Sequence, residues 1–565
     1  MTSTCIAERF ARQAEPVLGG GGAAEETKLG LQEGAWLFAA VAIPLVLNPT
    51  GVQVFDLPKI ALLRTVVIAM AALWLWRRLS AHRVAAEHGA RVPWSDPILW
   101  AGALGLVYTT AALVSPDVGL SFWGSYSRQE GLYTTLVYLL LFALVATEMR
   151  QPKQAERLAL AIALGSLPIV LYGLFQVAGL DPIPWQTLDK SPALATIGRS
   201  NFVGSYLAMS IPLSIAALVS SRRPWLRGAL ALVVLASLAL LALTNARAAW
   251  VAIVVAGLAL LALSGWHKGG WRNVAPYAGL ACAALVVFAA AYLATLWMAG
   301  LIQPGNLLRV PELSGSLAAR VTIWEASLQL VAERPLLGFG PDGFYLAFYH
   351  VFPPQLVFYQ GRGLVTDRAH DVFLQQAVNA GLLGLAVYIA LLATLIAKLV
   401  RGRHLSVRHG RVVAAAMLAA ALGHLVDLLF SFDVASTAVV FWIVAGAGVG
   451  LTRQRAENRV LPSADAQMPT GGLPKWRRAA AGTFVAAALA IVLGSSVLPL
   501  VADTFAGRSL RPGVPLAERL DDAARAVGIW PFEPAHRAGL GRHSAAVHFG
   551  YYVEAVLELG DLERL

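Results

Sequence analysis

The chain has 565 residues, of which 57% are hydrophobic and only 14% are charged. A soluble protein carries about a quarter charged residues, so this composition excludes an ordinary soluble enzyme. The net charge of +11 would suit nucleic acid binding in a soluble protein, but the cytoplasmic loops of membrane proteins also collect Lys and Arg. The two cysteines, Cys5 in a polar segment and Cys282 in an apolar run, argue against a disulfide framework or a cysteine-based metal site.

The first 33 residues are polar, with a glycine run at 19–22 and scattered acidic side chains. They contain no apolar core followed by a cleavage site, so they do not have the pattern of a signal peptide. We predict that residues 1–33 form a disordered cytoplasmic tail.

Long apolar runs fill most of the remaining sequence. They are rich in Leu and Ala and do not alternate with polar residues, which favours helices over a β-barrel. Because a helix needs about 20 apolar residues to cross a membrane, we predict an all-α polytopic protein with about 12–13 transmembrane helices. The predicted spans are 35–50, 59–76, 97–114, 132–148, 156–178, 202–219, 226–244, 247–264, 276–299, 376–399, 411–430, 434–451 and 478–501.

The charges between these runs predict the side of the membrane on which each loop lies. With a cytoplasmic N-terminus, basic residues gather in every second loop, and the opposite loops contain far fewer. The transmembrane domain then covers residues 34–501, and its longest loop, at about 300–370, lies outside the cytoplasm. Residues 502–565 also lie outside, and apolar residues at helical spacing predict a small helical tail there that could begin a repeat array.

The long loop is predicted to contain short helices of its own. Ser316 could cap a helix that runs to about Glu333, with Leu317, Val321, Trp324 and Leu328 on one face. A turn-rich strip at 335–340 and an aromatic run at 344–349 follow. An interfacial helix with aromatic anchors would explain the apolar residues. It does not explain why basic residues collect in a compartment where they are otherwise sparse.

His370 is the strongest candidate for a catalytic group. It precedes a predicted span and is followed by Asp371, in a wet external position. Histidine titrates near neutral pH and can take a proton from an attacking hydroxyl. A helix N-terminus disfavours imidazolium and would keep the ring neutral. The alternative is an interfacial histidine without a chemical role.

Two external arginines could bind a diphosphate through their paired donors. Arg247 stands alone between two apolar runs, where it could instead extend to the membrane surface. Arg320 lies one helical turn before Trp324, on which it could simply stack. Arg128 and Arg199 occupy Gly-rich external segments that could be plain turns.

Acidic residues give weaker indications of a functional site than His370 and the arginines do. Asp427 and Asp433 flank the end of a span, and His424 lies one turn before Asp427, so a local His–Asp pair could form there. No Asp-x-Asp motif occurs in an external loop, which argues against a metal-dependent transferase.

Taken in order, these residues resemble the O-antigen ligase and polymerase superfamily. That family has a His, a nine-residue gap and Gly-x-x-Gly, here His370 and Gly381 to Gly384. It also has an Arg shortly before a Trp, followed by a Pro-Leu-Leu-Gly-x-Gly strip. The other matching segments are Arg320 to Trp324, Pro335 to Gly340, Arg128 to Gly131, Gly198 to Asn201 and the Arg247 turn. The likeness covers about residues 35–450, with Asp371 in place of the usual Asn and Leu385 where ligases often have a small hydroxyl residue.

The resemblance implies an inverting, metal-independent glycosyltransferase without a cofactor in a bacterial cytoplasmic membrane, its active site facing the periplasm. The donor would be a glycan on undecaprenyl or another polyprenyl diphosphate, and the acceptor lipid A–core lipopolysaccharide, another glycan or a protein. His370 would be the base, and Arg247 and Arg320 would bind the diphosphate. Further substrate contacts could come from Arg128, Arg199, Asp371 and Trp324. A polymerase or a protein O-oligosaccharyltransferase is the nearest alternative, and a lipid-linked oligosaccharide flippase is an alternative of another class.

Overall fold

The computed structural model describes residues 30–80, 94–183, 185, 193–263, 316–360, 366–402, 408–457, 475–511 and 513–531. Every regular element within these ranges is a helix. Eight of the described helices are at least 18 residues long and apolar enough to cross a membrane, and four shorter apolar helices accompany them. This part of the chain therefore has the predicted fold of a polytopic all-α membrane protein.

The helices match the predicted spans within a few residues. The long apolar helices are α3 (Asp56–Ser80), α7 (Pro152–Val177), α8 (Ser200–Ser220), α9 (Pro224–Leu243), α15 (Val372–Gly402), α16 (Arg408–Asp427), α17 (Ala435–Glu457) and the run α18 (Lys475–Val492), η2 (Leu493–Val497) and α19 (Leu498–Ser509). The shorter ones are α2 (Leu31–Leu45), α4 (Pro97–Leu113), α6 (Leu132–Glu148) and α10 (Arg247–Leu263). The predicted span at 276–299 and the tail before residue 30 lie outside the described residues.

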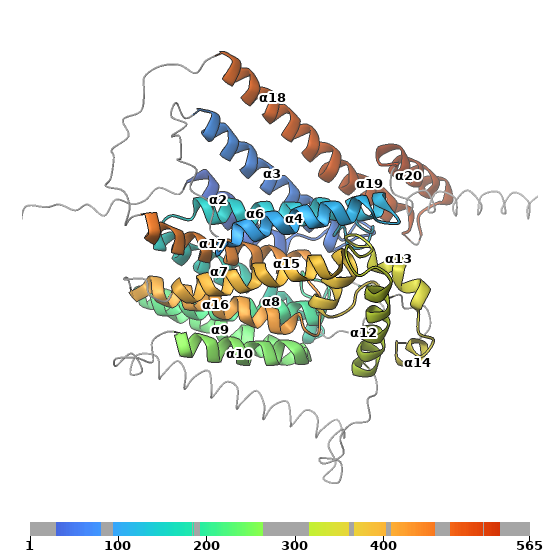
Figure 1. Ribbon diagram of the computed structural model, residues 1–565. Helices are drawn as coiled ribbons and strands as arrows, with labels where there is room; N and C mark the ends of the chain where they lie inside the picture. The colour runs from blue at the N-terminus through green and yellow to red at the C-terminus, as the bar shows by residue number, and fades with distance from the viewer. Residues whose placement is uncertain are drawn as a thin grey trace, which may run out of the picture.

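Consecutive helices alternate in direction, so the bundle has two ends (Figure 1). One end carries the short helices α5 (Val118–Trp123), α12 (Ser316–Glu333), α13 (Phe344–Phe348), α14 (Leu356–Gln360) and α20 (Leu516–Ile529). We call it the His370 end, because α15 begins there. At the opposite end α3 and α6 finish and α7 begins, and we call it the Arg77 end.

Small residues let the helices of the bundle approach one another closely. A Cβ atom at Gly204 of α8 would lie 2.7 Å from the Cβ of Ala246 and 2.8 Å from that of Ala249, at the start of α10. Helix α16 packs against both α8 and α10. In lipid, such close contact supplies much of the attraction between helices. It also holds Arg247, at the start of α10, and Asp427, at the end of α16, at the same end of the bundle.

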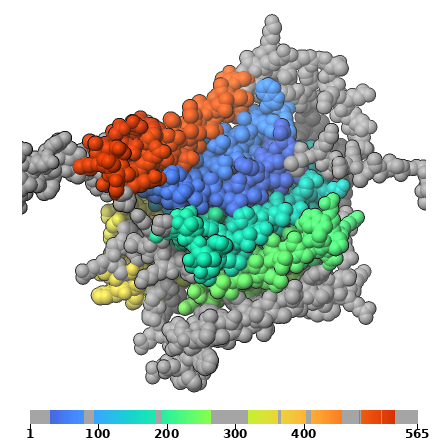
Figure 2. All heavy atoms as spheres, turned by 180° about the vertical axis from the view of Figure 1, so that it is seen from behind, coloured from blue at the N-terminus to red at the C-terminus, as the bar shows by residue number. Residues whose placement is uncertain are grey.

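The last long helix contains a π-helical turn, η2, which faces a buried arginine. Arg64 of α3 is 1% exposed and donates from Nη1 to the Ser495 carbonyl at 3.1 Å and from Nη2 to Thr134 Oγ1 at 2.7 Å. Its guanidinium lies 4.6 Å from the centre of the Tyr133 ring. A π-turn departs from the regular helical hydrogen bonding and is frequent at functional sites. Figure 2 shows α18 and α19 lying along α3, the arrangement that this contact requires.

The helix in the long loop has the predicted bounds. Of the residues predicted to share one face, Leu328 is 57% exposed and Val321 and Trp324 are half-buried, whereas Ile323 and Leu330 are fully buried. These two pack with small alanines of α12 against a cluster that includes Phe344 and Phe348. The buried face of α12 therefore combines Ile323 and Leu330 with small residues.

A backbone joint connects the long loop to α15. The helix is broken at Gly381, where φ is 67° and ψ is −173°. The strip at 335–340 pairs with the break: Phe339 N donates to the Val378 carbonyl at 2.8 Å, and Leu382 N donates to the Pro335 carbonyl at 2.7 Å. A Cβ atom at Gly381 would collide with the Leu336 carbonyl. Glycine is therefore required both by the positive φ and by the close approach of the two backbones.

We expect Gly381→Ala to lower the free energy of unfolding by about 1–3 kcal/mol, because it combines backbone strain with a collision. The measurement is the thermal unfolding midpoint of the purified protein in detergent. Gly257→Ala is the matched control, since a Cβ there meets no atom within 4 Å. Alanine in a helix is favoured over glycine by about 1 kcal/mol, so the control should keep or raise the midpoint. An unchanged midpoint for Gly381→Ala would contradict the requirement for glycine where the strip at 335–340 pairs with α15.

Candidate functional site

His370 lies at the start of α15 in a strained backbone conformation. Its φ is 56°, in the left-handed region that non-glycine residues seldom occupy. The neighbouring backbone is held by side chains: Asp371 Oδ1 accepts from Leu374 N at 2.8 Å, and Gln375 Oε1 accepts from Ala369 N at 2.8 Å. Val372 N donates to the Leu428 carbonyl at the end of α16 at 3.0 Å. Such enforced strain is concentrated at functional sites.

The imidazole of His370 is oriented with one nitrogen available. Nδ1 lies 3.0 Å from the Arg368 carbonyl, which can only accept, so Nδ1 carries the proton in the neutral ring. Nε2 then holds the free lone pair. Burial, together with the nearby positive charges of Arg320 and Arg128, lowers the pKa of His370 to about 4. The ring is therefore neutral at physiological pH, as predicted, although burial is the largest cause.

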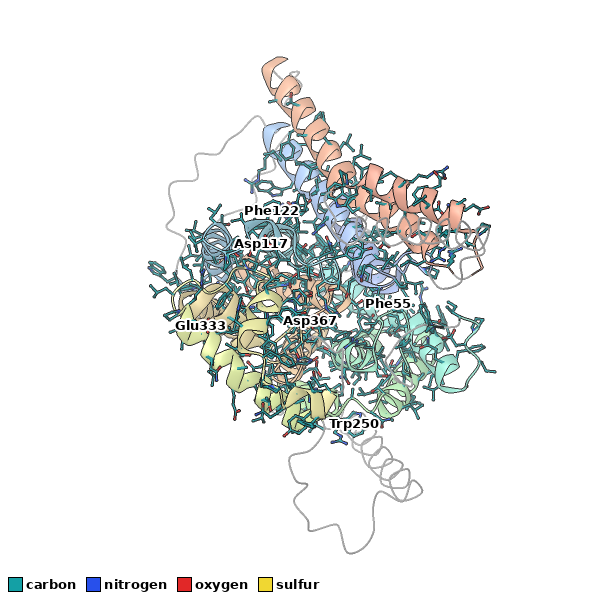
Figure 3. The ribbon with its side chains drawn as sticks, turned by 90° about the vertical axis from the view of Figure 1, so that its right-hand side faces the viewer. Phe55, Asp117, Phe122, Trp250, Glu333 and Asp367 are labelled. Carbon is teal, nitrogen blue, oxygen red and sulfur yellow. The ribbon has the colours of Figure 1, made fainter. Side chains whose placement is uncertain are left out.

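His370 lines a cavity of about 1000 Å³ at this end of the bundle. Arg64, Arg128 and Arg199 contribute the basic side chains of its wall, and Trp123, Tyr126 and Trp530 contribute aromatic ones. The rings of Trp123 and Trp530 meet edge to face, 6.1 Å apart. Figure 3 looks onto this end, with Asp367 near the middle of the bundle. Trp530 follows α20, so the C-terminal tail supplies part of the wall.

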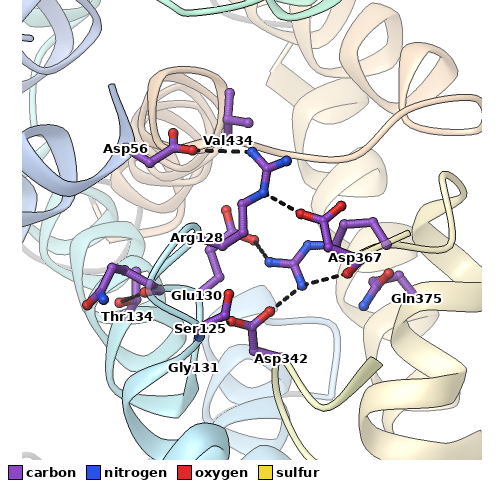
Figure 4. A network of polar contacts seen from close by, with 12 residues as sticks. Asp56, Ser125, Arg128, Glu130, Gly131, Thr134, Asp342, Asp367, Gln375 and Val434 are labelled. Atoms are coloured by element: carbon purple, nitrogen blue, oxygen red, sulfur yellow. Dashed lines mark hydrogen bonds and ion pairs between the residues drawn. The ribbon is translucent and has the colours of Figure 1, made fainter. Parts of the chain in front are cut away.

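Two buried arginines beside the cavity are held in a network of carboxylates (Figure 4). Arg128 Nε lies 2.7 Å from Asp367 Oδ2, and its Nη1 lies 3.3 Å from Asp56 Oδ2. Arg368 Nη2 lies 2.9 Å from Glu130 Oε2, and its Nη1 donates to Asp342. The network joins α3, the loop before α6 and the end of the long loop.

Glu130 is the neutral member of this network. Burial raises its pKa to about 8 despite the nearby Arg368, and the negative charges of Asp342 and Asp56 act in the same direction. The positive charge of Arg368 compensates Asp342, which leaves a second buried carboxylate without full compensation. Protonation of Glu130 removes this uncompensated negative charge.

We expect Glu130→Gln to leave folding intact, because glutamine matches the shape and charge of a protonated glutamate. Arg368→Gln should destabilise the protein by about 3–5 kcal/mol, because it strands a buried carboxylate. Thermal unfolding and the yield of monodisperse protein measure both. A stable Arg368→Gln protein would contradict the structural role of this network.

Arg247 and Arg320 do not line the cavity, but they lie near one another, and Arg320 lies near His370. Burial lowers the pKa of Arg320, partly offset by the charge of Asp427 and reinforced by that of Arg247. The charge of Arg320 also reaches His370. Among the described residues, no carboxylate lies within 4.0 Å of either arginine. Trp324, one turn along α12, has a buried Nε1 without a hydrogen-bond partner. The structure thus brings together two cations and an unused donor that suit an anion.

The comparison with known families adds to this geometry. Residues 230–389 match the family model described as O-antigen ligase. This match supports the O-antigen ligase superfamily for this part of the chain. A search of curated proteins finds no significant match. A domain of this family supports glycan transfer of the O-antigen ligase or polymerase type in general, and such a domain suggests lipid-linked glycan substrates and a bacterial inner membrane.

The segment that matches the O-antigen ligase family contains part of the predicted site. It includes His370, Arg247 and Arg320, and also Trp324 and Asp371. Arg128 and Arg199 precede it, although both line the cavity. The contact of Asp371 with Leu374 N caps α15, which accounts for this residue without a substrate. Asparagine caps helices as well, so the replacement of the family's Asn by Asp371 preserves this role.

Sequence reasoning missed two cavity residues, Arg64 and Trp530. Arg64 sits inside a predicted span, where an intramembrane charge is itself a signal of function. Trp530 lies in a tail with no recognisable motif.

The predicted pairing of His424 with Asp427 is replaced by one with Asp433, whose Oδ1 lies 3.2 Å from His424 Nε2.

Proposed function

We propose that this protein transfers a glycan from a polyprenyl diphosphate to an acceptor hydroxyl at the His370 end of the bundle. The observation that carries the proposal is a neutral, strained His370 that lines a large cavity and lies near Arg320, which with Arg247 forms a pair of arginines that have no carboxylate partner among the described residues. The family match supports the same reaction class. In the proposed orientation the His370 end faces the periplasm, and the loops rich in arginine and lysine face the cytoplasm.

The donor diphosphate is assigned to Arg247 and Arg320. Two guanidinium groups that repel one another gain stabilisation when an anion lies between them. The indole N–H of Trp324 offers a third donor. The exposed apolar surface of α10, including Val251 and Leu258, suits the prenyl chain. Fixed positive charge at the leaving group would stabilise the charge that develops there without requiring a divalent cation.

The reaction is a displacement at the anomeric carbon. The acceptor oxygen attacks this carbon and forms the new glycosidic bond, while the bond to the diphosphate oxygen breaks with inversion. The acceptor proton passes to Nε2 of His370, and the polyprenyl diphosphate departs as an anion. A pKa of about 4 makes His370 a weak base for a free hydroxyl. Proton transfer is therefore expected late, when attack has already acidified the hydroxyl.

The large cavity is assigned to sugars. Sugar rings present apolar faces that pack on aromatic side chains, and Trp123, Tyr126 and Trp530 line the wall. Arg199 and the paired Arg128 lie between this cavity and a second one of about 550 Å³, which Trp185 also lines. Two adjoining cavities suit a reaction that joins two glycans or a glycan and a second acceptor.

A reconstituted assay tests the proposal. Proteoliposomes receive a polyprenyl-diphosphate glycan together with lipid A–core, free glycan and a protein acceptor in separate reactions. We expect release of polyprenyl diphosphate coupled to glycosylation of one acceptor. Movement of the intact donor across the bilayer, with no transfer to any acceptor, would replace the transferase with a flippase.

A further inference from the structure

A further polar cavity lies at the Arg77 end of the bundle, the end on the left of Figure 1. Its volume is about 690 Å³, and it lies between α2, α3, α6 and α7. Along α3, Arg64 lines the cavity beside His370 and Arg77 lines this one, which separates the two residues by about 20 Å at 1.5 Å per residue. This cavity has no part in the proposed transfer.

Four arginines and two glutamates line this cavity, so positive charge exceeds negative charge by two. One arginine is fully paired: Arg157 Nε lies 2.5 Å from Glu33 Oε1, and its Nη2 lies 2.8 Å from Glu33 Oε2. Arg77 and Arg150 share Glu148 at 3.9 and 4.0 Å, beyond hydrogen-bonding distance. Both side chains are open to solvent, with exposed fractions of 44% for Arg77 and 67% for Arg150, so their donors are accessible to an anion that enters the cavity.

The cavity also contains buried polar atoms that the described protein does not satisfy. Trp36 is fully buried, and its Nε1 has no hydrogen-bond partner. Gln32 is 2% exposed; its Nε2 donates to the Met70 carbonyl at 2.8 Å, but its Oε1 has no partner. Burying an unpaired donor or acceptor is costly, so such atoms point to a missing ligand. An unused donor suits a phosphate oxygen, and an unused acceptor suits a hydroxyl.

The surroundings indicate a lipid headgroup. The guanidinium of Arg78 lies 5.3 Å from the centre of the Trp74 ring, and Trp76 is 41% exposed beside it. Tryptophan at helix ends is typical of the membrane–water boundary. Basic pockets between transmembrane helices bind anionic headgroups.

We propose that this cavity binds the phosphate of an anionic phospholipid through Arg77 and Arg150, with Trp36 Nε1 as a further donor. A glycerol hydroxyl of the headgroup fits the free oxygen of Gln32. The chemistry recognised is a phosphate monoanion that bears a hydroxyl group nearby, as in phosphatidylglycerol.

The experiment uses the purified full-length protein, stripped of lipid in a neutral detergent. Native mass spectrometry measures the binding of phosphatidylglycerol and of phosphatidylcholine, and thermal unfolding is followed with each lipid and with inorganic phosphate alone. Because a basic residue near an anionic surface strengthens binding about fivefold, we expect the double variant Arg77→Gln/Arg150→Gln to bind phosphatidylglycerol about thirty-fold more weakly. Phosphatidylcholine should bind weakly to every form.

Arg222→Gln/Arg223→Gln is the matched control, because both arginines are exposed and lie at the same end of the bundle, between α8 and α9. It should bind phosphatidylglycerol as the wild type does. Trp36→Phe removes the indole N–H together with part of the buried ring and should weaken binding several-fold, and its unfolding midpoint without lipid shows how much the smaller ring costs. This variant provides a second test if the double variant folds poorly. Equal binding by the wild type and both cavity variants would overturn the site. Equal stabilisation by millimolar inorganic phosphate would overturn the lipid as its ligand.

Discussion

His370→Asn is expected to lower the rate of glycan transfer by about 10²–10⁴-fold, the usual contribution of a positioned base. Asparagine tolerates the positive φ at this position, so the loss should not come from backbone strain. The measurement is kcat in the reconstituted assay, alongside the thermal unfolding midpoint. A His370→Asn protein with normal stability and normal kcat would remove the assignment of His370 as the base.

The pH dependence of the wild type provides a second readout of the same residue. The pKa of His370 is lowered to about 4 by burial, so the ring stays unprotonated and able to accept a proton from pH 8 down to about 5. We expect kcat to be level across this range and to fall as the pH approaches 4. A fall centred near pH 6.5 would indicate a solvated imidazole and contradict its burial.

Arg320→Gln and Arg247→Gln are each expected to lower transfer by about 10²–10³-fold, the cost of removing one donor to a developing anion. The stability should respond in the opposite sense. Burial disfavours the charge of Arg320, and Asp427 offsets this only in part, so removing that charge should keep or raise the unfolding midpoint of the empty protein. Arg247 is exposed, so its removal should change the midpoint little. Loss of activity without loss of stability is the signature of a group placed for its ligand.

Arg334→Gln is the control for this pair, because Arg334 follows α12 in the same loop and is exposed. Its contact, from Nη1 to the Val114 carbonyl at 3.4 Å, is long. We expect nearly full activity from this variant. If Arg320→Gln and Arg334→Gln behave alike, the diphosphate does not depend on Arg320.

Sequence alone predicts the helices well. Apolar length and the alternation of basic loops are local properties, and each predicted span among the described residues coincides with a helix such as α6, Leu132–Glu148. Ordered motifs also identify the parts of the joint at Gly381 and the strip at 335–340. Their pairing follows from the positive φ of Gly381 and from carbonyls that the broken helix leaves free. Both features belong to the three-dimensional structure and leave no pattern in the sequence.

The polar network is beyond sequence prediction for a physical reason. Glu130 and Arg368 are 238 positions apart, and Arg128 and Asp367 are 239 apart. Such partners are set by which helices become neighbours in the bundle, and no local periodicity records that. The buried face of α12 is likewise set by its neighbour α13, against which Ile323 and Leu330 pack together with small alanines.

The contact between Arg64 and the Ser495 carbonyl constrains the order in which the molecule is built. The two residues are separated by 431 positions, so a ribosome delivers the guanidinium to the membrane long before its π-turn partner exists. Until then Thr134 and the Tyr133 ring, which are made much earlier, are the partners that α6 offers to this charge. An intramembrane charge is costly unless it is paired, so α6 has to pack beside α3 before the last long helix completes the surroundings of Arg64. Because Pro499 and Trp530 also line the large cavity, its wall is complete only after this late step.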